Sequence, residues 1–329
     1  MSKVQWRPQL NALTTPQSNI SGLCLPPFLL FSHIGYMTMK QHIICKTVLS
    51  VLFCLFPLHV FAACPSSKEV HSRAAAFLDN RPVDLYAGEL SLQDAYCAQK
   101  QYVAALIPQY GQPAGYKVGF TGKALQERFQ VSEPALAVLL DKMLLPDGAI
   151  FSLASAHRPM SEPDILVTVK DKGIMTATTE PEAAAHLDEV RPFLELPAIP
   201  FSKESKLTGT TLVAANIAAR AGVSGQGRKI AATPEFIQAL ADMETVFTDE
   251  TGAVLQKAPG SHLLGNPLRA VLWLIKELQA RGETLQAGQV ISLGGFGKLF
   301  PLKEAGKTYT LTYTGLPGGP LSTSVQTSE

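Results

Sequence analysis

The sequence predicts an α+β fold built around a mixed β-sheet. After residue 64 the first segments have the apolar spacing of helices. Strand-like segments and further helices follow, without a regular strand–helix–strand alternation. Hydrophobic residues make up 46% of the 329 residues, which excludes a mostly disordered chain. This length fits one large domain or two closely packed ones. Because regular strand–helix–strand alternation is missing, we do not expect a doubly wound nucleotide-binding fold.

Helices are predicted where apolar residues recur every three or four positions between a capping residue and a helix-ending residue. Ser91 is an N-cap, and Pro108 and Gly111 mark the end of the helix that follows it. Thr179 and Glu182 form a capping box at the start of another helix. The predicted helices cover residues 68–78, 91–107, 121–128, 179–190, 207–221 and 266–282.

Strands are predicted where short apolar or alternating runs are bounded by turn residues. The run at 115–120 is a short apolar stretch that contains one lysine. The polar stretch 248–252 has the composition of a turn and joins its neighbours into a hairpin over 246–255. The remaining predicted strands cover residues 149–151, 165–169, 193–196, 290–293 and 308–312.

The N-terminal fifth of the chain differs chemically from the rest. Residues 1–63 contain four basic and no acidic residues, and the run 47–63 carries no charge. We expect a signal peptide over 39–63, cleaved after Ala62 or Ala63, and export to the bacterial periplasm. The alternatives are a retained membrane anchor and a lipoprotein acylated on Cys64. Residues 1–38 are an over-extended gene start or a disordered leader, and 64–329 form the catalytic domain.

Cysteine usage is consistent with export. Five cysteines occur in the chain, and removal of residues 1–63 leaves Cys64 and Cys97. Oxidising compartments pair cysteines, so we expect one disulfide between these two. The alternative is two separate thiols, because the sequence alone does not bring their Cα atoms within bridging distance.

Charge and motifs exclude several classes of function. The chain has 28 basic and 27 acidic residues, a net charge of +1, so it has no basic excess for binding nucleic acid. It contains no H-E-x-x-H, G-x-S-x-G or C-x-x-C motif, which argues against zinc proteases, serine hydrolases and thiol redox proteins. We expect a membrane contact only through the signal segment.

Three carboxylates are candidates for a metal site. Glu162 and Asp164 are two positions apart in an extended segment, so their side chains point to the same face. Like charges placed in this way repel one another unless a cation lies between them, and carboxylates suit Mg²⁺ or Mn²⁺. Glu195 lies in the apolar run Phe193–Leu196. The alternative is that all three are solvated surface residues.

Several motifs, in collinear order from about Val70 to the C-terminus, resemble one enzyme family. The motifs are Gly115–Thr121, Glu133–Pro134, Leu139–Met143, Glu162–Asp164, Leu194–Leu196, Leu240–Met243, Leu264–Leu274 and Leu285–Ile291. Together they resemble the 2-keto-4-pentenoate hydratase and 4-oxalocrotonate decarboxylase family of the fumarylacetoacetate hydrolase superfamily.

The resemblance implies a fumarylacetoacetase C-terminal-like roll of mixed β-sheet with flanking helices. It implies a metal-dependent hydratase that acts on a small 2-hydroxy-dienoic or 2-oxo acid through a metal-bound enolate. Glu162, Asp164 and Glu195 would hold Mg²⁺ or Mn²⁺, Lys117 would contact the substrate, and Asp141 occupies a further catalytic position of the family. We also expect a homo-oligomer. Decarboxylation and C–C hydrolysis would use the same site.

Four departures from the family pattern bear on activity. Asp164 is shorter than the glutamate of the family, and Pro197–Phe201 replaces a segment with acidic and basic residues. Ala215–Ala218 lacks an aspartate of the family, and Gly294–Gly297 lacks two hydroxyl residues. These departures leave open a second hypothesis, an exported relative that binds a small acid without turnover.

Overall fold

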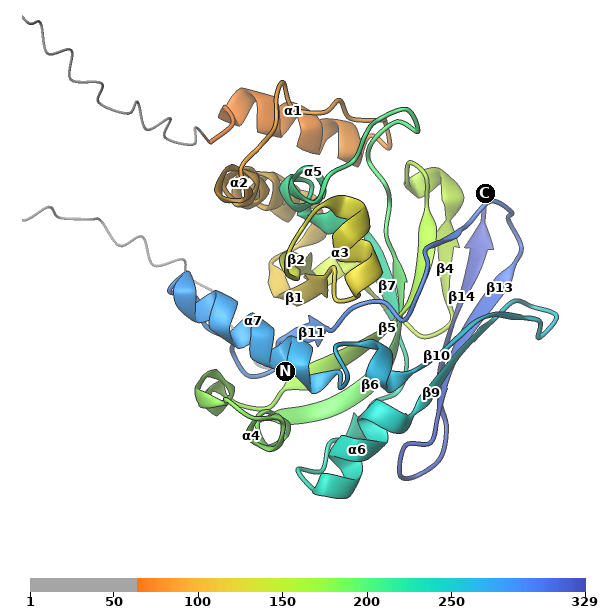
Figure 1. Cartoon of the computed structure of the whole chain (residues 1–329). Coiled ribbons are helices and arrows are strands. Elements are labelled where there is room, and N and C mark those ends of the chain that lie inside the picture. Colours follow the sequence, from red (N-terminus) through yellow and green to blue (C-terminus); the bar gives the residue numbers. More distant parts are fainter. Residues whose placement is uncertain (1–63) are drawn as a thin grey trace, which may run out of the picture. The chain divides into compact units, whose positions relative to one another are not determined.

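Residues 64–329 are described by a computed structural model (Figure 1). The predicted leader and signal peptide lie outside the described residues. Helices and strands follow one another along the chain without a regular alternation, and the strands form two curled β-sheets. Each sheet contains both parallel and antiparallel strand pairs. The prediction of an α+β fold with mixed sheet is confirmed.

The larger sheet carries the residues singled out from the sequence. Its strands follow the order β2-β1-β11-β5-β6-β7-β3, with β12 paired to β5 and β8 paired to β6. Parallel pairing joins β1 to β11 and β3 to β7. The strands are β1 (Pro113–Gly119), β2 (Ala135–Leu140), β3 (Leu144–Pro146), β5 (Met160–Val169), β6 (Leu187–Leu196), β7 (Ala221–Ser224), β8 (Arg228–Lys229), β11 (Val290–Ser292) and β12 (Phe300–Pro301).

The smaller sheet has the order β10-β9-β13-β14-β4. Tyr313 of β13 reaches the larger sheet and donates a hydrogen bond to the main-chain oxygen of Asp164 in β5. The smaller sheet therefore supports the strand that holds two of the candidate carboxylates. Its strands are β4 (Ala149–Ser152), β9 (Glu244–Thr248), β10 (Val254–Pro259), β13 (Thr308–Thr314) and β14 (Leu321–Ser328).

Helices flank these sheets. The helix α1 packs on α2 through an edge contact between Phe77 and Tyr102, whose ring centroids are 5.8 Å apart. Gln99 of α2 donates hydrogen bonds to the main-chain oxygens of Leu136 in β2 and Val213 in α5. The helices are α1 (Ser67–Leu78), α2 (Leu92–Tyr110), α3 (Lys123–Phe129), α4 (Glu180–Ala185), α5 (Gly209–Ala214), α6 (Pro234–Asp242) and α7 (Leu268–Ala280).

Some predicted helix boundaries were wrong. The helix predicted over 179–190 ends at Ala185, because 187–190 pair with β5 as the start of β6. The helix predicted over 207–221 is only α5, because residues 216–218 adopt a left-handed backbone. Pro108 lies inside α2, and Gly111, with a φ of +85°, follows its last residue. The helix α6 was not predicted.

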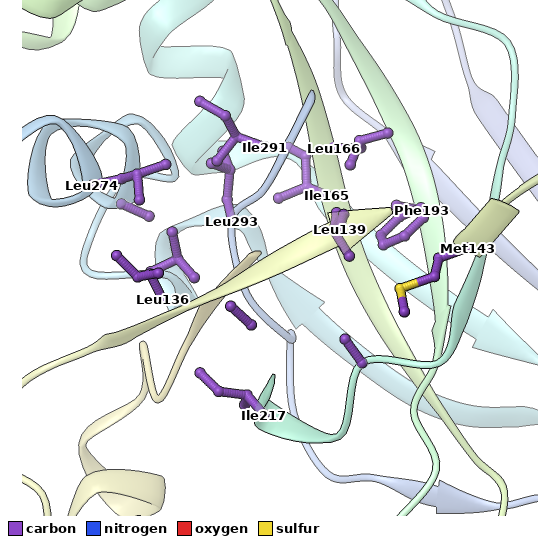
Figure 2. Close-up of a cluster of buried hydrophobic side chains, with 14 of the residues drawn as sticks. Leu136, Leu139, Met143, Ile165, Leu166, Phe193, Ile217, Leu274, Ile291 and Leu293 are labelled. Atoms are coloured by element: carbon purple, nitrogen blue, oxygen red, sulfur yellow. The ribbon is translucent and has the colours of Figure 1, made fainter. Parts of the chain in front are cut away.

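Apolar side chains pack on both faces of the larger sheet and form a continuous core. Figure 2 shows Leu139 of β2, Ile165 of β5, Phe193 of β6 and Ile291 of β11 gathered with Leu274 of α7. All five side chains are 3% exposed or less. Strand β5 is buried along nearly its whole length, so the acidic residues at its start are drawn into a dry environment.

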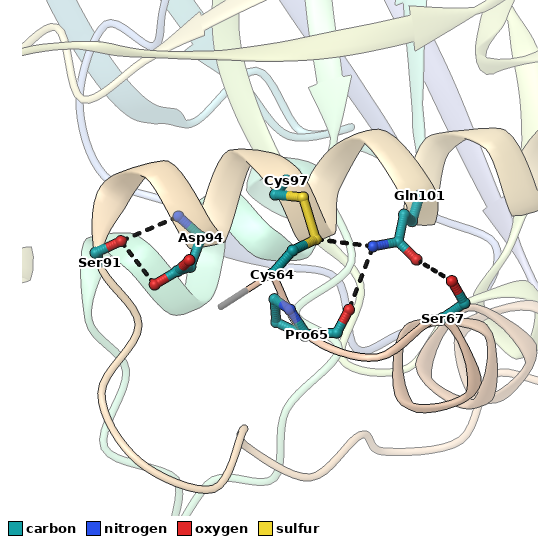
Figure 3. Close-up of a disulfide and its surroundings, with 7 residues drawn as sticks. All are labelled: Cys64, Pro65, Ser67, Ser91, Asp94, Cys97 and Gln101. Atoms are coloured by element: carbon teal, nitrogen blue, oxygen red, sulfur yellow. Dashed lines mark hydrogen bonds between the residues drawn. A yellow bond between two sulfur atoms is a disulfide. The ribbon is translucent and has the colours of Figure 1, made fainter. Parts of the chain in front are cut away.

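The first described residue is covalently attached to α2. Cys64 and Cys97 form a disulfide with a Cα–Cα distance of 5.6 Å, which confirms the expected pairing (Figure 3). Gln101 of α2 donates hydrogen bonds to the sulfur of Cys64 and to the carbonyl oxygen of Pro65, and accepts one from Ser67. Within the described residues, no helix combines the length and apolar character needed to cross a membrane.

Candidate active site

Two paired strands bring the three predicted carboxylates together. Strands β5 and β6 are antiparallel, with Glu162 directly opposite Glu195 and Asp164 opposite Phe193. Residues directly opposite one another in such a pair share a face of the sheet, so all three acidic side chains point the same way. They are 8%, 0% and 1% exposed for Glu162, Asp164 and Glu195. The alternative of three solvated surface residues is therefore wrong.

Lys117 reaches this acidic group from β1. Its Nζ lies 2.5 Å from Oε1 of Glu195, and it donates a hydrogen bond of 3.3 Å to the carbonyl oxygen of Ile217. Its side chain is 6% exposed. The register of β1 with β11 pairs Lys117 with Ser292, so one further strand lies between the lysine and β5. The lysine brings a positive charge to the buried carboxylates.

Asp164 has the most hydrogen bonds of the three acids. Its carboxylate accepts bonds from Ser292 Oγ at 2.7 Å, from the N–H of Gly294 at 3.1 Å and from its own neighbour Ile165 N–H at 2.5 Å. These donors fix the orientation of the shorter side chain. Ser292 was not predicted as a site residue; the signal for it is a single hydroxyl residue among the three apolar residues of the predicted strand 290–293.

The buried charges shift one another's protonation. Burial, followed by the charge of Glu195, raises the pKa of Glu162 well above its usual range. The same two causes raise the pKa of Asp164 to about 7. Burial lowers the pKa of Lys117, but the charges of Glu195 and Glu162 outweigh this and raise it overall. Lys117 is therefore an ammonium ion at neutral pH.

A cavity of about 530 Å³ opens above Lys117 and Glu162, which both line it. This volume is in the range of small-molecule sites. Apolar side chains form much of the wall, among them Phe129 of α3, Ile199, and Leu212 of α5. Ile199 belongs to the Pro197–Phe201 segment, so this departure from the family pattern supplies an apolar wall.

The glycine segment 294–297 fits closely around the site. A Cβ on Gly295 would lie 2.1 Å from Oε1 of Glu162, and one on Gly294 would lie 2.3 Å from Oγ1 of Thr121. Gly294 also has a φ of +113°, which strains any other residue. The segment leaves no room for side chains at these two positions. The hydroxyl of Thr121, a buried residue that lines the cavity, lies beside Gly294.

A left-handed turn forms another part of the site. Asn216, Ile217 and Ala218 have φ angles of 54°, 47° and 56°, which are unusual for residues other than glycine. The amide of Asn216 bonds both the N–H and the carbonyl oxygen of Val138, each at 2.8 Å. The turn places the Ile217 carbonyl oxygen against Lys117 and lets Ile217 and Ala218 line the cavity.

Asp141 does not join this group. It is exposed, directly follows β2, and accepts a hydrogen bond of 3.1 Å from the N–H of Gln112. Pro113 next to it pairs with Leu140, whereas the cavity lies at the Lys117–Gly119 end of β1. The structure therefore places Asp141 at a turn beyond the other end of the strand pair, where its carboxylate fixes the backbone.

Both oxygens of Glu195 are buried and lack a hydrogen bond. The ammonium of Lys117 lies at ion-pair distance from Oε1 but not in hydrogen-bond geometry. Among residues 64–329, no three acidic, histidine or cysteine side chains are arranged as a ready-made metal site. Lys117 lies beside Glu195, and three donors bond the carboxylate of Asp164.

Comparison with known proteins gives a consistent set of relatives. No family model matches the chain. It is 28% identical over 263 residues to a 2-oxo-hept-4-ene-1,7-dioate hydratase of Escherichia coli, covering 75% of this chain and 95% of that protein. It is 30% identical over 211 residues to a 2-keto-4-pentenoate hydratase of Paraburkholderia phymatum, covering 61% of this chain and 74% of that protein.

A solved structure has the same fold. The 4-oxalocrotonate decarboxylase of Pseudomonas putida G7, complexed with magnesium and adipate, superposes with a TM-score of 0.70. The match covers 80% of this chain and 98% of that one, at 24% sequence identity. The described part of this chain therefore includes the elements of that fold.

Proposed function

Because the chain belongs to the 2-keto-4-pentenoate hydratase family, we propose that it is a metal-dependent hydro-lyase for a small 2-hydroxy-dienoic acid, the enol form of a 2-oxo acid. The observation that carries the proposal is the buried group of Glu162, Asp164, Glu195 and Lys117, of which Glu162 and Lys117 line a cavity of small-molecule size. Three departures from the family pattern have a place in this geometry: Asp164 is held by hydrogen bonds, Ile199 of the segment 197–201 forms part of the wall, and the glycines at 294–297 pack against Glu162. This favours a catalytic site over a degenerate one.

The acidic group suits a divalent cation. Both oxygens of Glu195 are buried without a hydrogen bond, and Glu162 lies opposite on the paired strand. An all-oxygen donor set favours Mg²⁺ or Mn²⁺, and the structurally similar decarboxylase was solved with magnesium. A bound ion would supply Lewis-acid polarisation of the substrate's 2-oxygen. Glu162 and Glu195 would hold it, with Asp164 as the third acid.

Lys117 acts as a fixed positive charge in this proposal. Its raised pKa keeps the ammonium protonated, so it binds the anionic carboxylate or enolic oxygen of the substrate and can donate a proton to it. In the net reaction the hydroxyl of water adds to one carbon of the conjugated chain. Two other carbons take up the protons released by the enol hydroxyl and by the water.

Water exclusion is the role of the cavity wall. Phe129, Ile199 and Leu212 surround the space above Lys117 and keep the charged base in an apolar environment. Electrostatic attraction to the substrate is stronger there than in water. The closely packed glycine segment lies against the Glu162 carboxylate and limits its movement.

The decisive experiment is an absorbance assay of purified protein with a panel of 2-hydroxy-dienoic acids, with Mg²⁺ or Mn²⁺ and with a chelator. We expect metal-dependent loss of the dienoic absorbance. Glu195→Gln should abolish turnover and weaken Mn²⁺ binding at least about 10-fold, because a negative ligand is lost. The matched control is Glu189→Gln on the same strand, a half-buried acid paired with Arg191.

Other outcomes of this assay select the other hypotheses. Release of CO₂, or cleavage of a C–C bond, would assign a decarboxylase or hydrolase that uses the same site. Binding of the acids without turnover under any metal condition would assign a non-catalytic binder. Unchanged Mn²⁺ affinity in Glu195→Gln would reject the metal assignment itself.

We also propose that the protein is exported to the periplasm after cleavage of the signal peptide predicted over 39–63. The Cys64–Cys97 disulfide supports this, because disulfides form and persist in oxidising compartments. Retention through an uncleaved anchor, or acylation of Cys64, remains the alternative location. Acylation would use the same sulfur as the disulfide, so the two exclude each other.

A further inference from the structure

The outer wall of the active-site cavity is cationic. Four basic residues line it: Arg128 of α3, Arg158, Lys203 and Lys298. They come from four separate segments, whereas Glu162 at the base is the one acidic residue among those that line it. Among the described residues, none of these four side chains forms an ion pair with a carboxylate within 4.0 Å. Four positive charges therefore line one cavity.

The contacts that position these basic side chains do not include a carboxylate that would neutralise them. Arg158 donates only to main-chain oxygens, those of Phe201 at 2.9 Å and Ser202 at 3.1 Å. It thereby fixes the loop that carries Lys203. The guanidinium of Arg128 lies over the ring of Phe129, 5.3 Å from its centroid. Hydrogen bonds to its own backbone and to Ser202, and then the charges of Lys203 and Arg158, lower the pKa of the exposed Glu204, which does not line the cavity.

The lining changes in character with depth. Lys117 and Glu162 are buried at the base, and the apolar residues of the wall are buried or half-buried except for Leu299, which is exposed next to Lys298. Arg128, Lys203 and Lys298 are exposed. A ligand that fills the cavity therefore meets charge at its inner end, an apolar stretch along its middle and positive charge at its outer end.

We propose that the substrate is a dicarboxylic 2-oxo acid whose distal carboxylate binds this cationic rim. The proposal rests on the hydro-lyase function above and adds the substrate class. Four like charges around one opening repel one another, and a second carboxylate relieves this repulsion. A monocarboxylic acid would leave the rim without a partner. The competing explanation is that the rim merely attracts anions of any kind towards the cavity.

The test compares a dicarboxylate with a monocarboxylate of equal chain length. Binding of adipate and of hexanoate, each with Mg²⁺ present, is measured by titration calorimetry on the parent and on the triple variant Arg128→Gln, Lys203→Gln, Lys298→Gln. We leave Arg158 unchanged because it fixes a loop. We expect adipate affinity to fall about tenfold and hexanoate affinity less than about twofold, as for three partly exposed ion pairs.

The matched control is Lys123→Gln, an exposed lysine on α3 that does not line the cavity. It should leave both affinities unchanged. Equal losses for both acids would overturn the proposal in favour of general anion attraction, and no loss for adipate would overturn it outright. A selective loss for adipate in a protein that turns over no 2-oxo acid would support the rim while rejecting the hydratase function.

Discussion

At the scale of single residues, the site depends on one lysine among three buried acids. Glu162, Asp164 and Glu195 lie on one face of β5 and β6, and Lys117 is the basic residue in contact with them. A buried ion pair contributes little net stability, but removal of one partner leaves a charge that burial strongly disfavours. The lysine should therefore stabilise the metal-free protein as well as bind the substrate.

Lys117→Met tests this directly. We expect the metal-free variant to lose about 3–5 kcal/mol in the free energy of unfolding, because the ammonium is lost and the acids stay buried. Mn²⁺ should restore more stability to the variant than to the parent. Urea unfolding with chelator or with Mn²⁺ measures both effects, and Lys142→Met, at an exposed position, is the control. Equal response of variant and parent to Mn²⁺ would contradict this account.

The raised pKa values predict how the metal-free protein responds to pH. Asp164 titrates near pH 7 when folded and near 4 when unfolded, so the folded protein binds more protons between these values. Glu162 shifts in the same direction. Stability should therefore fall as pH rises from 5 to 8. Urea unfolding with chelator measures it, and Asp164→Asn should flatten the dependence. A rise in stability over this range would be the contrary result.

At the scale of elements, the register of two strands could be predicted only in part. That Glu162 and Asp164 share a face is predictable from the sequence, because the alternation of side chains along a strand is local. The pairing of Glu162 with Glu195 depends on how β5 meets β6, and the family resemblance, rather than the alternation, suggested it. The left-handed turn at 216–218 was not foreseen, since Asn216 adopts it through a bond to Val138, 78 residues away.

The glycine segment 294–297 is predicted to position Glu162, because a side chain at position 295 would occupy the space of its carboxylate. Gly295→Ala places a Cβ where Oε1 of Glu162 lies, so the carboxylate must move. We expect turnover and Mn²⁺ affinity to fall together, with a stability loss of about 1–3 kcal/mol from overpacking. The control is Gly122→Ala, where an added Cβ meets only His262 at 4.0 Å. Unchanged metal affinity in Gly295→Ala would refute this role.

At the scale of the whole molecule, the disulfide links the first described residue to α2 across 33 positions. Cys97→Ser should lower the free energy of unfolding by about 2–4 kcal/mol and leave substrate KM unchanged, because the bridge does not line the cavity. Exported protein should show no free thiol after denaturation and should begin at Ala63 or Cys64. Two titratable thiols, or a mature chain that begins at Met1 or Met39, would contradict the export proposal.

The order of strands in the larger sheet also determines when this enzyme can assemble. Strand β11 lies between β1 and β5, although its residues follow those of β5 by more than a hundred positions. Until the ribosome has made residues 290–292, the sheet lacks the strand that joins Lys117 to the acidic pair. The nascent chain therefore stays incompletely folded through most of its synthesis, which is the state that a secretion channel for unfolded polypeptides requires.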